Sequence, residues 1–160
     1  MKLLLNFLGL VVLALAGFWV YSQFSTSGFL LKTSQPREVL VYFNKVEEND
    51  IIQQAVTREV APADDAMTQA IKELLIGPTE EEKAQGLSTA LNEGTELNYI
   101  QVENGTATLD FNDRFDFQMG GSARVLALRQ QIEKTLKQFP EITTIKLTIN
   151  QGEREAVLEP

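Results

Sequence analysis

The sequence contains neither histidine nor cysteine. Without cysteine the chain has no disulfide, no thiolate ligand for a metal, no cysteine nucleophile and no cysteine for a lipid anchor. Without histidine it lacks the commonest general base, the usual zinc ligand and every Ser-His-Asp arrangement. These absences exclude many enzyme classes, and the sequence predicts no metal and no other cofactor.

Basic residues are also scarce, since 14 lysines and arginines stand against 22 aspartates and glutamates, for a net charge of -8. Nucleic-acid binding needs a basic surface that neutralises phosphates, so no nucleic-acid partner is expected. The 160 residues are enough for one domain with a real hydrophobic core and a short appendage.

Charge is absent from residues 3–21, which directly follow Lys2. A helix of this length spans roughly 28 Å, about the hydrocarbon thickness of a bilayer. Residues 1–21 therefore predict one membrane-spanning helix, with the N-terminus in the cytoplasm and the rest of the chain outside it. Because Ala14-Leu15-Ala16 resembles a signal-peptidase site, a cleaved signal peptide is the alternative. The expected anchor residues include Leu3, Val11, Val12, Leu13, Trp19 and Tyr21.

Residues 22–37 predict a linker, because their serine, threonine, glycine and proline disfavour helix and strand. Phe29, Leu30 and Leu31 are unusually apolar for a solvated spacer. We expect these three residues to contact the membrane surface, the folded domain or a neighbouring protein.

The folded domain is expected over residues 38–152, followed by a polar tail over residues 153–160. The first elements are a strand at residues 39–43, predicted to be buried on both faces, and an extended segment at residues 52–60. A helix follows, with N-cap oxygens from Asp64 or Asp65, an apolar stripe and a stop at Gly77-Pro78.

The second half of the domain begins with a hairpin, in which residues 96–102 and 106–111 flank the preferred type I′ turn Asn104-Gly105. A second helix begins at Ser122, which we expect to be its N-cap, and residues 145–149 alternate as a strand with one wet face. Glu80-Glu81-Glu82 is expected to be a solvated turn. Arg58 lies either on the wet face of its strand or beside a carboxylate, and both alternatives stay open.

Each helix carries one apolar stripe, which indicates that it packs on one face of a sheet. The predicted fold class is therefore α+β, a two-layer sandwich with two helices on one face of a small mixed sheet, preceded by one transmembrane helix.

Several motifs of the folded domain match a known pattern together and in order. They are Val41-Tyr42-Phe43, Val56-Thr57-Arg58-Glu59-Val60, Leu74-Leu75-Ile76-Gly77-Pro78-Thr79, Gly94-Thr95, residues 104–111 and residues 131–140. Jointly they resemble the GerMN domain, the bacterial sporulation and spore germination domain. The resemblance implies an extracytoplasmic module, similar in fold to ring-building motifs, that docks onto like domains or partner proteins. The family has no established catalytic residues.

Catalytic chemistry has few candidates in this sequence. No Ser-x-x-Lys occurs, and the acidic run at residues 110–116 places Arg114 where an oxygen ligand for a cation is wanted. A carboxylate-dependent hydrolase with Asp110 and Asp116 is a remote alternative. A non-catalytic peptidoglycan or carbohydrate-binding domain is a nearer one. Its candidate aromatic residues are Tyr42, Tyr99, Phe115 and Phe117.

The function that we expect is that of a membrane-anchored extracytoplasmic interaction module, an assembly or accessory subunit of a bacterial membrane or envelope complex. Its partners would be membrane proteins or other copies of the chain, with the lipid bilayer bound by residues 3–21. If the helices bury Val39, Val41 and Phe43, then Leu40 and Tyr42 lie on the open face of the sheet. We expect Leu40 and Tyr42 to bind a partner, the linker residues 29–31, or both.

Overall fold

The computed structural model describes residues 36–48, 50–62 and 65–157. The expected anchor and the expected linker up to residue 35, Phe29 to Leu31 included, lie outside this described part, while Arg37, expected to end the linker, is the first residue of a strand. Among the described residues, no helix is both long enough and apolar enough to cross a membrane. The elements, in order, are β1 (Arg37–Glu47), β2 (Asp50–Val60), α2 (Ala66–Ile76), α3 (Glu80–Ala84), β3 (Leu87–Ser88), β4 (Leu97–Glu103), β5 (Thr106–Phe111), α4 (Ser122–Leu136), β6 (Thr144–Ile149) and β7 (Arg154–Glu155).

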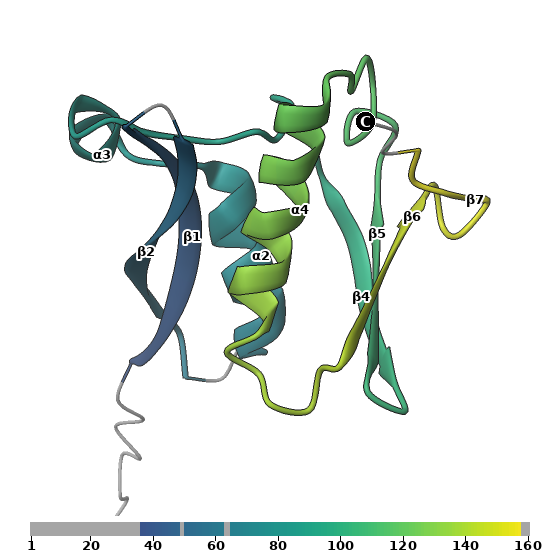
Figure 1. Ribbon diagram of the computed structural model, residues 1–160. Coiled ribbons are helices and arrows are strands. Elements are labelled where there is room, and N and C mark those ends of the chain that lie inside the picture. Colours follow the sequence, from purple (N-terminus) through teal and green to yellow (C-terminus); the bar gives the residue numbers. More distant parts are fainter. Residues whose placement is uncertain (1–35, 49, 63–64, 158–160) are drawn as a thin grey trace, which may run out of the picture. The chain divides into compact units, whose positions relative to one another are not determined.

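The strands form two sheets, not the single sheet expected from the sequence. One sheet has the order β2-β1-β3, and the other has the order β4-β5-β6-β7. The second is mixed, because β5 and β6 are parallel while its other pairs are antiparallel. Figure 1 shows α2 and α4 between the β1–β2 hairpin and the strands β4, β5 and β6. The expected two-layer sandwich is therefore wrong, and the fold has three layers.

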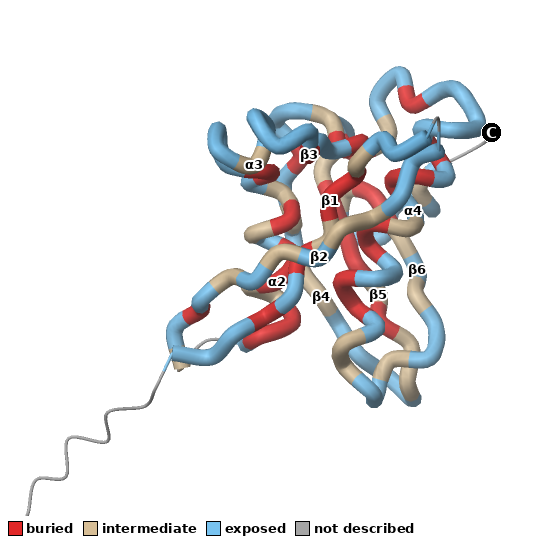
Figure 2. Tube along the Cα trace, turned by 60° about the vertical axis from the view of Figure 1, so that its left-hand side comes forward, coloured by how far each residue is buried: buried red, intermediate tan, exposed pale blue. Residues whose placement is uncertain are grey.

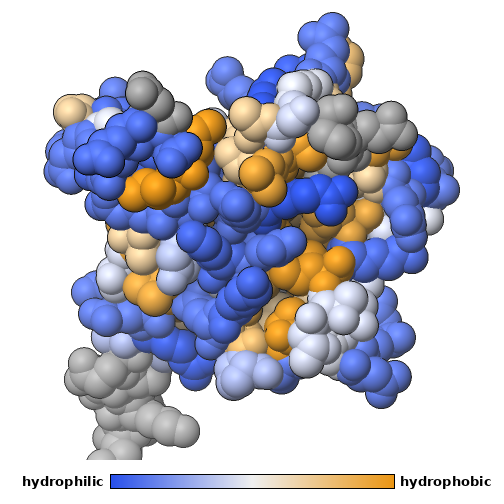
Figure 3. All heavy atoms as spheres, viewed as in Figure 1, coloured by the Kyte–Doolittle hydropathy of each residue, from blue (hydrophilic) through white to orange (hydrophobic). Residues whose placement is uncertain are grey.

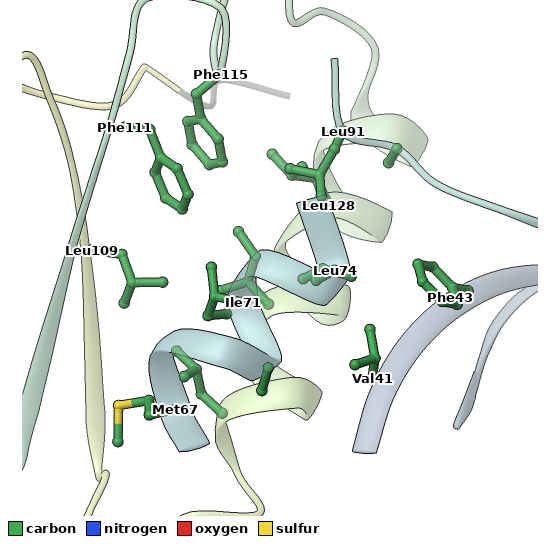
Figure 4. Packing of buried hydrophobic residues seen from close by; sticks show 14 of the residues in the cluster. Val41, Phe43, Met67, Ile71, Leu74, Leu91, Leu109, Phe111, Phe115 and Leu128 are labelled. Carbon is green, nitrogen blue, oxygen red and sulfur yellow. The ribbon is translucent and has the colours of Figure 1, made fainter. Parts of the chain in front are cut away.

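The reason is that the helices contact apolar residues on both sides. Figure 4 shows Ile71 and Leu74 of α2 between Leu109 of β5 and the β1 residues Val41 and Phe43. All five side chains are at most 1% exposed. A stripe wide enough to reach two sheets is hard to distinguish in sequence from one that covers a single sheet.

Several local predictions are confirmed. Asp65 is the N-cap of α2 and accepts a hydrogen bond from the Thr68 backbone N–H. Gly77 ends that helix with φ of 86°. Asn104 and Gly105 have φ of 49° and 80°, as a type I′ turn requires. The expected strands and the second helix are also present, within a few residues of their predicted ends.

Other local predictions are wrong. The N-cap of α4 is Gly121, and no side chain caps this helix, so Ser122 is its first residue and not its cap. The acidic residues 80–82 lie in α3, where Thr79 and Glu82 form a reciprocal capping box. β1 is not buried on both faces, because Leu40 is 37% exposed.

Candidate functional site

The site predicted from sequence lies on the β1–β2 hairpin, and its geometry follows from strand alternation. Val39, Val41 and Phe43 point toward the helices and are at most 2% exposed. Leu40 and Tyr42 therefore point to the opposite side of the sheet. Leu40 is exposed and Tyr42 is half-buried, so the expected location of both residues agrees with the structure.

The partner strand completes this surface. In the antiparallel register Leu40 lies opposite Thr57, and Tyr42 lies opposite Ala55. Cross-strand partners place their side chains on the same face of a sheet. We call this surface the outer hairpin face and define it by Glu38, Leu40, Tyr42, Ala55, Thr57 and Glu59. It consists of a small apolar centre with one carboxylate on each strand at one end.

No described helix or strand packs against the outer hairpin face. Figures 1 and 2 show the hairpin as an outermost layer of the domain, with both long helices on its other side. On the face of the domain drawn in Figure 3, much of the surface is hydrophilic, with several hydrophobic areas between hydrophilic ones. The domain also has a groove of about 390 Å³, lined in part by Ile132 of α4 and by Ile145 and Leu147 of β6.

The α4 helix holds the backbone of β1 in place. The amide of Gln138 accepts from the Leu40 N–H at 2.9 Å and donates to the Leu40 carbonyl at 2.7 Å. Thr135 Oγ1 accepts from the Tyr42 N–H at 3.2 Å, and Gln131 Nε2 donates to the Tyr42 carbonyl at 3.1 Å. Two side chains of α4, with Gln138 just after its end, thus replace a strand along this edge of β1, which fixes the position of Leu40 and Tyr42.

Sequence reasoning missed this arrangement. Gln131 and Thr135 are fully buried, and Gln138 follows them at helical spacing. Two polar residues inside the apolar stripe of a helix are the signal that was available. Buried amides need hydrogen-bond partners, but the sequence does not say that the partner is a strand edge.

An ion pair connects β2 to the rest of the domain. It shows that Arg58 lies beside a carboxylate and not on the wet face of its strand. Arg58 binds Glu82 of α3 through two hydrogen bonds of 2.7 Å, and its Nε lies 3.5 Å from Glu73. Its guanidinium also lies 5.6 Å from the centre of the Phe43 ring. The hydrogen bonds from Arg58 lower the pKa of Glu82, more than burial raises it. Arg58 is therefore a structural residue of the inner side.

Asp110, the first candidate of the remote hydrolase alternative, is fully buried. It accepts from Asn98, Thr148 and the backbone N–H groups of Gln151 and Gly152, at 2.7 to 2.8 Å. Burial alone raises the pKa of Asp110, but these four hydrogen bonds outweigh it and lower the pKa below its ordinary value. A carboxylate with both oxygens occupied in this way holds the β6–β7 turn and presents no open face to a substrate.

Asp116, the second candidate, is bound elsewhere. It accepts from the Arg154 guanidinium and from the Val157 backbone N–H. The hydrogen bond from Arg154 is the main cause of its lowered pKa. No group of three acidic side chains suited to a metal ion occurs in the described ranges.

The aromatic residues considered for carbohydrate binding do not share one surface. Phe115 is fully buried and stacks on Phe111, with ring centres 4.2 Å apart. Phe117 is 49% exposed, and the Arg114 guanidinium lies 5.0 Å from its ring centre. Tyr42 and Tyr99 belong to different sheets. The structure thus removes Phe115 from that set.

The described part of the chain is a small mixed α+β domain with two sheets and few helices, and this class is found among solved GerMN structures. The chain belongs to the GerMN family, described as sporulation and spore germination, whose model matches residues 40–155. No curated protein matches its sequence.

Solved structures that are similar to the chain include three from Bacillus subtilis and Clostridium perfringens. The tandem GerMN domains of the sporulation protein GerM from Bacillus subtilis superpose with a TM-score of 0.64 at 24% identity, over 79% of this chain. The chain covers 43% of that structure, which is less than half of its length. The first GerMN domain of the same protein gives a TM-score of 0.53 at 26% identity, over 73% of this chain and 85% of that one.

The third structure is a putative lipoprotein from Clostridium perfringens. It gives a TM-score of 0.51 at 17% identity, over 76% of this chain and 79% of that one. At this identity the likeness concerns the fold alone.

Proposed function

We propose that the chain is a membrane-anchored, extracytoplasmic and non-catalytic interaction module, which serves as an assembly or accessory subunit of a bacterial membrane or envelope complex. The observation that carries the proposal is the outer hairpin face. It presents Leu40 and Tyr42 to solvent on a backbone that α4 holds in place. A fixed surface with an amphipathic aromatic residue is typical of a docking site.

The setting of this role is proposed from two further observations. Residues 3–21 are long and apolar enough to span a bilayer, with Trp19 and Tyr21 at the far end. One structural relative is a sporulation protein and another a putative lipoprotein, and both descriptions fit a location at the cell envelope.

Charge indicates the kind of partner. The chain carries a net charge of -8, and two of its carboxylates, Glu38 and Glu59, lie beside the apolar centre of the outer hairpin face. Complementary potentials favour association, while like charges oppose it. The partner at this face is therefore a membrane protein with a basic or neutral patch around an apolar contact.

The test is the double variant Leu40→Asp with Tyr42→Ser, made in the full chain and expressed in its native membrane. The proposal predicts that proteins which co-purify with the original chain after gentle detergent extraction are lost from the variant. Tyr99→Ser with Val102→Asp is the matched control, because it changes the same two kinds of side chain on β4 of the other sheet. Val102 is 43% exposed, close to the exposure of Leu40.

Retention of the complex by the folded Leu40 and Tyr42 variant would contradict the proposed docking face. Recovery of the original chain as a lone monomer under gentle extraction would contradict the interaction role itself. Circular dichroism and thermal unfolding of both variants establish that they remain folded.

A further inference from the structure

β2 is an edge strand with a long unpaired side. All of its 11 residues pair with β1 in one unbroken register, and no described strand pairs with its other edge. Its sequence contains no proline and no lysine, two devices that usually protect a strand edge. Figure 2 shows β2 crossing the front of the domain in that view.

The hydrogen bonds of β1 show which groups this edge offers. Leu40 and Tyr42 direct their backbone groups to Gln138 and to α4, on the side away from β2. In an antiparallel pair the alternate residues, Val39, Val41 and Phe43, therefore bond to β2. Their partners are Arg58, Val56 and Gln54. The alternate residues of β2 therefore direct their N–H and C=O groups to the free edge. These are Ile51, Gln53, Ala55, Thr57 and Glu59.

We infer that this edge pairs antiparallel with β2 of a second copy of the chain, across a two-fold axis that places Gln54 opposite Gln54. The inference rests on the proposed role as an interaction module and names one of its partners. The joined strands form one sheet in the order β1-β2-β2-β1. Because outward-directed residues must face each other, the two-fold axis passes through a residue and not between two residues, and Gln53, Gln54 and Ala55 are such positions near the middle of β2. An axis at Val56 leaves Asp50 and Ile51 unpaired.

The side chains select the axis at Gln54. There Ile52 faces Val56, Ile51 faces Thr57, and Gln53 faces Ala55 of the second copy. Asp50 and Arg58 are the charged residues of this span and face each other with opposite signs, while Arg58 keeps its bond to Glu82. An axis at Ala55 sets Ile51 against Glu59 and Ile52 against Arg58, and an axis at Gln53 leaves residues 57–60 unpaired. Apolar pairs and pairs of opposite charge stabilise neighbouring strands, whereas like charges directly opposite each other destabilise them.

Pairing at this edge also enlarges the proposed docking site. The outward-directed residues of β2 are those whose side chains belong to the outer hairpin face, as the register with Leu40 and Tyr42 requires. The two outer hairpin faces then form one continuous surface, with Leu40 and Tyr42 present twice. At the free edge the Thr57 carbonyl accepts a hydrogen bond from Arg58 Nη1. This bond is long, at 3.5 Å, and an incoming strand can replace it.

The absence of cysteine makes the register directly measurable. Three single variants, Gln53→Cys, Gln54→Cys and Ala55→Cys, are made in the full chain in membranes and treated with a copper-phenanthroline oxidant. A self-facing residue brings its two Cα atoms within disulfide range, about 4.4–6.8 Å. We expect a disulfide-linked dimer from Gln54→Cys and loss of that band in the other two variants.

A mixed experiment provides the second measurement. Gln53→Cys and Ala55→Cys, each tagged differently and co-expressed, should form the heterodimer that neither forms alone. Ala55→Pro placed in the Gln54→Cys chain should abolish the crosslink, because it removes an outward N–H without breaking a bond to β1. Thermal unfolding of the Ala55→Pro chain verifies that its fold is kept.

Equal crosslinking at all three positions, or none at Gln54, overturns the inference. The proposed docking function fails separately, through the Leu40 and Tyr42 variant. If Gln54→Cys gives no crosslink while the original chain still co-purifies with its partners, the self-pairing is wrong and the docking function stands.

Discussion

Gln131 is the residue on which the position of the outer hairpin face most depends. Its side chain is fully buried, donates to the Tyr42 carbonyl and accepts from Asn44 Nδ2 at 3.0 Å and from the Ala90 N–H at 2.8 Å. One amide thus satisfies groups from β1 and from the loop after β3. The polar atoms that it serves are themselves removed from water, so its loss is expected to be costly.

Gln131→Leu keeps the size of the side chain and removes every one of these bonds. Leaving a buried polar group unsatisfied costs about 1–3 kcal/mol. We expect the free energy of unfolding to fall by about 3 kcal/mol, since more than one group is left without a partner. Urea denaturation followed by circular dichroism measures it. Gln130→Leu, one position earlier on α4 and only half-buried, should change stability by less than about 0.5 kcal/mol.

The lowered pKa of Glu82 makes the free energy of unfolding depend on pH. Its pKa is lowered from 4.5 by Arg58, so the folded state binds the proton less readily than the unfolded state. The stabilisation is therefore present above pH 4.5 and is lost as the pH falls through the lower, folded-state value. Glu82→Gln should lower the free energy of unfolding at pH 7 by about 2 kcal/mol, because a hydrogen bond to a charged group contributes about 1.5–3 kcal/mol.

The difference in unfolding free energy between the original chain and Glu82→Gln should shrink as the pH falls below 4.5. Denaturation of both proteins at several pH values between neutral and acid measures this difference. Asp65, Asp110 and Asp116 also have lowered pKa values, so both proteins lose stability in acid, and only their difference reports on Glu82. A difference that does not vary with pH would show that the Glu82–Arg58 pair does not cause this part of the pH dependence.

At the scale of elements, the β4–β5 turn is predicted by its sequence and reinforced by a tertiary contact. Gly105 has φ of 80°, and a Cβ there would lie 2.9 Å from Thr143 Oγ1 and 3.4 Å from the Glu141 carbonyl. Its own carbonyl accepts from the N–H groups of Thr143 and Thr144, at the start of β6. The turn thus both closes a hairpin and positions the next strand.

Gly105→Ala should destabilise the domain by about 2 kcal/mol, since an L-residue in this conformation costs about 1–2 kcal/mol before any contact is counted. Thermal unfolding measures the effect. Gly120→Ala is the matched control, because Gly120 lacks a positive φ and a Cβ there meets nothing within 4 Å. Equal melting temperatures for the two variants would show that the Thr143 contact is relieved at no cost.

At the scale of the whole molecule, the prediction that concerns residues 1–21 can be tested with the same cysteine-free chain. An uncleaved helix predicts that the protein stays with membranes in alkaline carbonate, and that removal of residues 2–21 releases it. Glu153→Cys, at an exposed position of the β6–β7 turn, should react in intact cells with a membrane-impermeant maleimide. A mature chain that starts near Gly17 would instead support the cleaved signal peptide.

Local chemistry made parts of the fold predictable from sequence. Three local features depend only on residues adjacent in the chain. They are the positive-φ turn at Asn104-Gly105, the N-cap at Asp65 and the end of α2 at Gly77. The alternation along β1 likewise predicted that Leu40 and Tyr42 share a face opposite Val39, Val41 and Phe43. The GerMN family was also recognisable, since its motifs are short and occur in a set order.

Only the tertiary structure decided the layers and the environment of the polar residues. The apolar stripes of α2 and α4 do not state how many sheets they contact, because a stripe records hydrophobicity and not the identity of its neighbour. Arg58 binds Glu82, which is 24 positions away in the sequence, and Gln131 binds the Tyr42 carbonyl, which is 89 positions away. Such pairings depend on long-range packing, which no local pattern encodes. For that reason the sequence determined that Leu40 and Tyr42 share the outer face of their strand. The fold determined which β2 residues complete that face, that α4 holds it in place, and that one edge of β2 pairs with no described strand.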